Sequence, residues 1–279
     1  MPRNHCPSEG AKSMEYILYL ALGAMAGLVG GLFGLGGGVV IVPILIIAFE
    51  LQGISHNVAT HMAVSTSLAS IIFTSIPSIY THAKKGSVRW SLVTWISPGI
   101  VLGALGGGLF ALSLTGSSLQ LLLGGFFMLV ALQMLFYKPQ AASRAGPGQP
   151  LLLVGGSGIG GISSLFGIGG GSLTIPFLTY FGVPMHHAVG TAAACGLPIA
   201  LFSTLIYAGA EAQSGNLPEG TLGYIFIPAW LGIVIASVPC ARLGALLAYR
   251  LNELRLKRLF GFLLIAMAAR LIWINLTGD

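Results

Sequence analysis

The chain has 279 residues, of which 55% are hydrophobic and only 7% are charged, with a net charge of +6. A soluble domain carries about 25% charged residues, so this composition excludes an ordinary water-soluble protein and indicates a membrane protein. The basic residues lie in short gaps between apolar runs, which is typical of membrane topology signals and not of a nucleic-acid-binding surface.

Ten apolar segments follow one another along the chain, and we expect an all-α polytopic membrane protein because they are long and unbroken, unlike alternating barrel strands. A spanning helix needs about 20 residues, which most of the segments provide. The second and the seventh are shorter and each follows a glycine cluster, so we expect broken or re-entrant helices there. The predicted segments are 14–33, 39–51, 58–80, 91–113, 117–137, 151–166, 172–182, 187–209, 222–243 and 257–276.

Two motifs recur in the same order and predict an internal duplication. Phe33–Gly38 reads FGLGGG and is followed by Pro43, while Phe166–Gly171 reads FGIGGG and is followed by Pro176. Further on, AVST at 63–66 is matched by AVGT at 188–191. A glycine-rich composition alone does not explain two ordered matches. We therefore expect an N-terminal tail (1–13), a first transmembrane repeat (14–137), a hinge linker (138–150) and a second transmembrane repeat (151–279).

Charge in one pair of equivalent loops predicts that the two halves are inverted. The loop after the third segment carries Lys84, Lys85 and Arg89, whereas the loop after the eighth carries Glu211 and Glu219 and no basic residue. Lysine and arginine collect on the cytoplasmic side of membranes. The two loops are therefore expected on opposite sides, which five crossings per half would produce.

The glycine clusters predict a site for a small anion. Glycine weakens a helix, and a broken helix inside the membrane is tolerated only where protein or a water-filled cavity surrounds it. The N–H groups at the start of the following short helix carry part of the helix dipole, which attracts an oxyanion without a buried lysine or arginine. Close packing of helices through small residues is the alternative explanation. The candidate residues are Gly34, Gly36, Gly37, Gly38, Gly167, Gly169, Gly170 and Gly171.

The same motifs resemble the sulfite exporter TauE/SafE family of membrane permeases. The resemblance covers about residues 16–273 and includes AVSTSL at 63–68 and the basic loop KKGSV at 84–88. It implies a multi-pass protein of the inner (plasma) membrane, with seven to nine spans, that moves sulfite, sulfonates or related sulfur-containing anions. Ser65 stands where the family usually has glycine, and Ala192 where it usually has serine.

Five further side chains are candidates for binding the anion. The hydroxyls of Thr66, Ser67 and Thr191 lie near the start of long segments, where the alternative is that they bond their own helix. His61 and His186 are related by the repeat and either hold an anion or proton, or lie at the membrane interface.

A permease that works by alternating access between the two halves is the function that this pattern favours. An anion channel, a membrane-embedded enzyme and an assembly factor without transport activity are the alternatives. The segments offer no nucleophile with its base and no metal-ligand cluster, so we expect no enzyme, metal or cofactor. The expected partners are a small anion, membrane lipid and a coupling ion, either a proton or sodium.

Overall fold

The computed structural model describes residues 9–33, 37–136, 147–210, 217–247 and 253–277 of the chain. In these residues the chain is almost entirely helical, which confirms the predicted all-α class. The first five helices are α1 (Glu9–Phe33), α2 (Gly38–Leu51), α3 (His56–Lys84), α4 (Trp90–Ser113) and α5 (Gly116–Phe136). The remaining five are α6 (Gln149–Phe166), α7 (Gly171–Tyr180), α8 (Met185–Ala208), α9 (Ile227–Leu247) and α10 (Glu253–Thr277).

Each predicted apolar segment corresponds to one of these helices, with one difference at the start of α9. The sequence predicts helix from residue 222, but residues 222–226 belong to a short antiparallel hairpin of β1 (Thr221–Leu222) and β2 (Ile225–Phe226). Gly223 turns the hairpin with a φ of 53°, a conformation that glycine adopts without steric cost. Most of the predicted hinge linker lies outside the described residues, and α6 begins at its end.

Six helices in the described residues are long and apolar enough to cross a membrane, judged by length and composition: α3, α4, α5, α6, α8 and α9. Among the shorter apolar helices, α2 is buried along most of its length, including Val39, Ile41, Leu45 and Phe49. A helix that is apolar on all sides belongs in an interior and not at a surface. Short α2 is therefore part of the core of the bundle.

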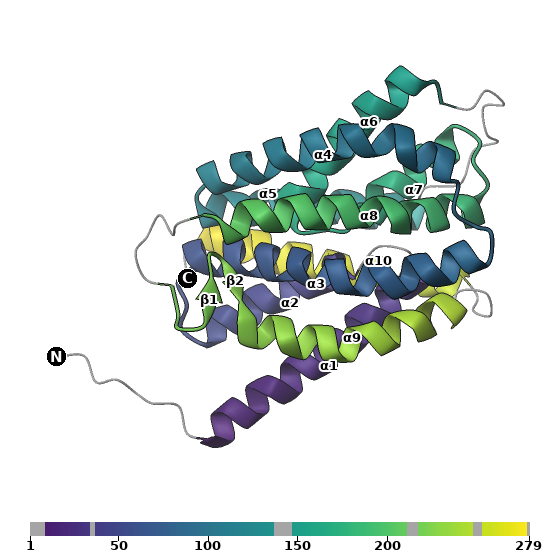
Figure 1. Ribbon diagram of the computed structural model, residues 1–279. Coiled ribbons are helices and arrows are strands. Elements are labelled where there is room, and N and C mark those ends of the chain that lie inside the picture. The colour runs from purple at the N-terminus through teal and green to yellow at the C-terminus, as the bar shows by residue number, and fades with distance from the viewer. Residues whose placement is uncertain (1–8, 34–36, 137–146, 211–216, 248–252, 278–279) are drawn as a thin grey trace.

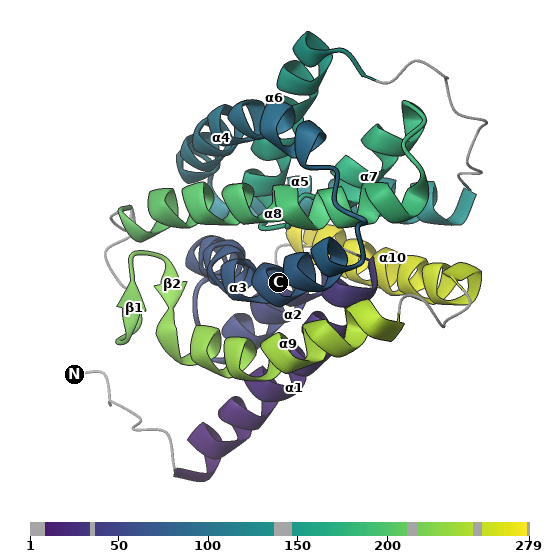
Figure 2. The same cartoon turned by 45° about the vertical axis from the view of Figure 1, so that its right-hand side comes forward.

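The helices of the first half pack in pairs against helices of the second half. Helices α3 and α8 lie side by side at the centre, α1 packs along α9, α4 along α6, and α5 along α10 (Figures 1 and 2). Glycines allow the closest of these contacts, because a methyl group at Gly23 or Gly27 of α1 would collide with the backbone of α9. Gly103 and Gly107 of α4 meet the backbone of α6 in the same way. Such close backbone approach is the usual means of association between membrane helices.

The two loops that differ in charge lie at opposite ends of the bundle. The α3–α4 loop with Lys84, Lys85 and Arg89 is at the right in Figure 1, and the hairpin that follows Glu219 is at the left. Helix α8 is antiparallel to α3, since the hairpin contacts both the start of α3 and the end of α8. An inverted repeat would place the loops in this way.

Candidate functional site

The two glycine clusters form matching breaks at the starts of α2 and α7. Gly37 precedes α2 with φ 78° and ψ −15°, and Gly170 precedes α7 with φ 72° and ψ −18°. Glycine is the residue that adopts this left-handed conformation readily. No side chain caps either helix start, and the first N–H groups of a helix have no partner within the helix. Both breaks therefore present amide groups at the start of a short helix.

The breaks are in direct contact with each other. Gly38 lies so close to the carbonyl oxygen of Gly167 that a methyl group at residue 38 would collide with it. The Ser67 hydroxyl donates a 2.8 Å hydrogen bond to the same oxygen, and Gly167 itself packs against Val42 and Val64. Of the other predicted glycines, Gly171 is the buried first residue of α7, and Gly34 and Gly36 lie outside the described residues. Close packing therefore dominates at Gly38 and Gly167.

A small cavity adjoins the second break. Gly169 lines it together with Gly30 of α1, Gly196 of α8 and part of α3. Its volume is about 10 Å³, which is about the space that one water molecule requires. The residues that line it are uncharged. An oxyanion with several oxygens is larger than water, so the cavity is too small for one in this conformation.

Three hydroxyl-bearing residues of α3 line this cavity. Thr74 donates to the carbonyl of Ile71 at 3.3 Å and Ser75 to that of Ile72 at 3.0 Å, both within the helix. The Ser78 side chain is only 4% exposed, and its hydroxyl has no hydrogen-bond partner. A buried polar group without a partner costs about 1–3 kcal/mol. Ser78 is therefore a group for which a ligand would supply the missing bond.

The predicted hydroxyls at residues 66 and 191 bond to backbone groups. Thr66 accepts a 3.1 Å hydrogen bond from the N–H of Phe226, just before α9. Thr191 accepts a bond of the same length from the N–H of Arg89, just before α4. Each threonine therefore joins its own half to the fourth long segment of the other half, and the two contacts match as the repeat would require. In this conformation both hydroxyls hold helices together away from the cavity.

The two predicted histidines lie at opposite ends of the bundle. His61 is buried, with Nδ1 2.9 Å from the carbonyl oxygen of Asn57 and Nε2 3.0 Å from that of Ala111. His186 is exposed, and its ring centroid lies 4.1 Å from that of His187. Neither histidine lines the cavity.

Comparison with known proteins decides the family. The model of the family described as "Sulfite exporter TauE/SafE" matches residues 19–271. The chain belongs to the TauE/SafE family. Family membership and the six long apolar helices make the chain a multi-pass membrane transporter. A location in the inner membrane is consistent with these findings.

Several TauE/SafE relatives align over nearly the whole chain. A probable membrane transporter protein of Haemophilus influenzae is 34% identical over 255 residues, covering 90% of this chain and 96% of the relative. One of Methanocaldococcus jannaschii is 30% identical over 250 residues, covering 87% and 91%, and YunE of Bacillus subtilis is 29% identical over 264 residues, covering 86% and 89%. The transporter names agree with the expectation that the chain is not an enzyme. No solved structure matches the chain.

Sequence reasoning missed two polar residues of this TauE/SafE chain, Ser78 and His82. His82 is one turn beyond Ser78 on α3, is 2% exposed, and has no partner at either ring nitrogen. The spacing of Ile71, Thr74, Ser75, Ser78 and His82 is that of one face of a helix. This spacing was a usable signal, but α3 carries hydroxyls on other faces as well, and the sequence does not indicate which face meets a cavity.

Proposed function

We propose that the chain is a permease for small anions, with sulfur-containing oxyanions or organosulfonates as its substrates. The observation that carries this proposal is the cavity lined both by Gly169 of the second glycine break and by Ser78, whose hydroxyl has no hydrogen-bond partner. An oxyanion would accept hydrogen bonds from hydroxyls and backbone N–H groups there. Because the lining contains no carboxylate, it would not repel an anion. The names of the family and of its relatives support a transporter of this kind.

The site as proposed combines Gly169, Gly170 and Gly171 with Thr74 and Ser78. Gly38, Gly167 and Ser67 form the contact between the two breaks, and we propose that this contact shifts when the site opens. Gly37 packs against Ala26 of α1 instead. Four further residues remain predicted anion ligands, although their side chains contact other groups in this conformation: Thr66, Thr191, His61 and His186.

Alternating access between two inverted repeats is the mechanism that the arrangement of helices supports best. Helices α3 and α8 run antiparallel at the centre, and the cavity between them is too small for an anion. A carrier must enlarge this cavity towards one side at a time. The matched contacts of Thr66 and Thr191 would serve as corresponding joints of the two halves.

Flux into proteoliposomes that contain the purified chain tests the proposed function. Labelled sulfite, sulfate, thiosulfate and methanesulfonate are compared, and at least one is expected to enter at a rate that saturates with concentration. Rates equal to those of empty liposomes for all four anions would contradict a permease for this class. A rate that rises without saturation would favour a channel.

A pair of serine variants then tests the site. Ser78→Ala removes the hydroxyl at the cavity, whereas Ser70→Ala removes an equally buried hydroxyl that donates to the Thr66 carbonyl within the same helix. Loss of one hydrogen bond to an anion costs about 1.5–3 kcal/mol, which corresponds to an apparent affinity roughly 10- to 150-fold weaker. Equal affinities in the two variants would remove Ser78 from the site.

A further inference from the structure

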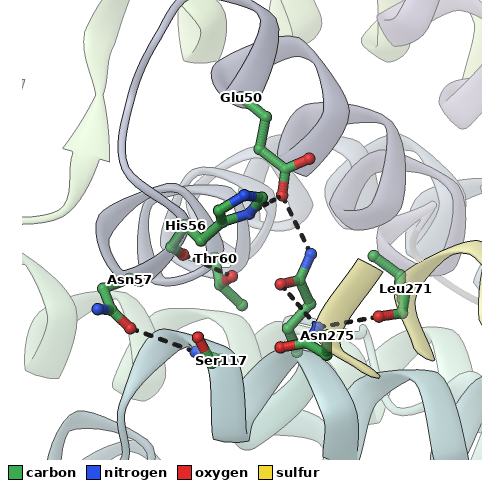
Figure 3. A network of polar contacts seen from close by, with 8 residues as sticks. Glu50, His56, Asn57, Thr60, Ser117, Leu271 and Asn275 are labelled. Carbon is green, nitrogen blue, oxygen red and sulfur yellow. Dashed lines mark hydrogen bonds and ion pairs between the residues drawn. The ribbon is translucent and has the colours of Figure 1, made fainter. Parts of the chain in front are cut away.

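A polar network at the far end of α2 connects four helices through one carboxylate. Oε1 of Glu50, in the last turn of α2, lies 2.8 Å from Nδ1 of His56 at the start of α3. The same oxygen accepts a 3.1 Å hydrogen bond from Nε2 of Gln120 on α5. Nδ2 of Asn275 on α10 donates to Oε1 of Gln120 at 3.0 Å (Figure 3). The sequence places Glu50 at a segment end, but the fold surrounds it with long-range partners.

The direction of these hydrogen bonds places an amide donor against the carboxyl group of Glu50. The carbonyl oxygen of Gln120 accepts from Asn275, so its NH2 group is the part that faces Glu50. Gln120 is 1% exposed, so its amide depends on that acceptor. Hydrogen bonds to an ionised group are roughly twice as strong as neutral ones. Protonation of Glu50 would therefore weaken the hold of α5 and α10 on α2.

Protons can reach this carboxylate from solvent. The side chain of Glu50 is 12% exposed, but that of its partner His56 is 44% exposed. Histidine is the side chain that ordinarily gains and loses a proton near neutral pH. Phe49 stacks edge-on against Phe226, which places this end of α2 beside the hairpin and away from the basic α3–α4 loop. If the basic loop is cytoplasmic, Glu50 faces the outside.

Other titratable groups lie on the elements that surround Glu50. Tyr19 of α1 accepts a 2.7 Å hydrogen bond from Gln52, and His61 of α3 stacks against Tyr224 of the hairpin. Helix α5 presents Gln120 and α10 presents Asn275, both uncharged, while Arg270 of α10 is exposed. Among the described residues at this end, Glu50 is the carboxylate that bridges helices.

The position of Glu50 on α2 links it to the proposed anion site. Helix α2 has only 14 residues, with Glu50 in its last turn and Gly38, which touches Gly167, at its start. A shift of this short helix would change the contact between the two breaks. Helix α7, the counterpart in the second half, ends at Tyr180 without a carboxylate in its last turn. The link is therefore present in one half only.

We propose that Glu50, assisted by His56, is the proton-binding site that couples anion movement to a proton gradient. This inference rests on the proposed function. A proton from the solvent at this end passes through His56 to the Glu50 carboxylate, which becomes a neutral carboxylic acid. After α2 has shifted with the bound anion, Glu50 releases the proton to the other side of the membrane and is charged again when α2 returns. One proton is bound and released in each transport cycle.

Coupled and exchange transport by the full chain in proteoliposomes test this proposal. The membrane potential is held at zero, and sulfate, thiosulfate and methanesulfonate are used because their own charge stays fixed near neutral pH. Exchange at equal pH measures the anion site, and accumulation under a gradient of one pH unit measures coupling. With one proton per anion, the wild type should accumulate anion about tenfold.

Glu50→Gln should exchange anions at the wild-type rate and accumulate none. Asn57→Ala is the matched control, because Asn57 accepts a 3.4 Å bond from the N–H of Ser117 and so joins α3 to α5 without a titratable group. This control should keep both activities. Glu50→Asp should restore part of the accumulation, because aspartate keeps the carboxylate on a side chain that is one methylene shorter.

Other results would overturn the proposal. A Glu50→Gln variant that accumulates anion like the wild type, or that loses exchange as well, removes Glu50 from coupling, and so does a wild type that ignores the gradient. A wild type that carries none of these anions or sulfite refutes the proposed function itself. If Glu50→Gln does not fold, the wild type is treated with a carbodiimide, which modifies protonated carboxyl groups. Modification of Glu50 should abolish accumulation, and intact accumulation would contradict the proposal.

Discussion

The contact between the two glycine breaks makes Gly38→Ala the most informative single substitution. A methyl group at residue 38 would collide with the carbonyl oxygen of Gly167, and would lie 2.9 Å from Cδ1 of Ile71 and 3.1 Å from Cα of Ile168. The φ angle of Gly38 is not positive, so alanine fits the backbone. Alanine also favours a helix by about 1 kcal/mol over glycine. Any loss therefore comes from the contact with the other break.

The magnitude follows from which atoms can move. The end of the Ile71 side chain can rotate away, but the carbonyl of Gly167 and Cα of Ile168 belong to the backbone. Overpacking of a tight core costs about 1–3 kcal/mol, which leaves a net loss of up to about 2 kcal/mol after the gain in helix propensity. Since 1.4 kcal/mol is a factor of ten in an equilibrium, transport should fall by up to roughly 30-fold.

The assay compares Gly38→Ala with Gly158→Ala in proteoliposomes and in thermal unfolding. Gly158 lies on α6, where a methyl group would have no neighbouring atom within 4 Å, so its substitution should leave transport unchanged and raise stability slightly. A Gly38→Ala protein with the transport rate and unfolding temperature of Gly158→Ala would refute the importance of the contact between the breaks.

Two more predictions concern the joints and the orientation of the halves. Thr66→Val and Thr191→Val each remove the acceptor of one backbone N–H, so each should lower the free energy of unfolding by about 1 kcal/mol; unchanged unfolding temperatures would contradict this. In a chain without its native cysteines, Lys85→Cys and Glu219→Cys should react with a membrane-impermeant thiol reagent from opposite sides, the second from outside, and labelling of both from one side would contradict the inversion.

Local signals in the sequence predict the helices and the breaks. Long apolar runs specify helices in lipid, and a glycine cluster before a short apolar run specifies where a helix must restart. Gly37 and Gly170 adopt nearly the same left-handed conformation because both precede such a run. The charges of two loops predict opposite sides of the membrane, and the structure places these loops at opposite ends of the bundle.

Features that depend on long-range packing could not be predicted in this way. The pairing of α1 with α9 and of α4 with α6 follows from which glycines meet which backbone. Ser78 resembles other α3 hydroxyls in sequence, and it differs from Thr74 and Ser75, which line the same cavity, in having no hydrogen-bond partner. In the sequence Glu50 lies at the end of an apolar segment, and only the fold brings Gln120, far along the chain, to within 3.1 Å of its carboxyl oxygen.

A crystal structure with bound selenite, the selenium analogue of sulfite, would test the proposed anion site most directly, because selenium is located by its anomalous scattering. Binding at the second glycine break predicts a selenium peak between Gly169 and Ser78, in a cavity larger than the present 10 Å³. A peak at another place, or none at a concentration that saturates transport, would contradict the site.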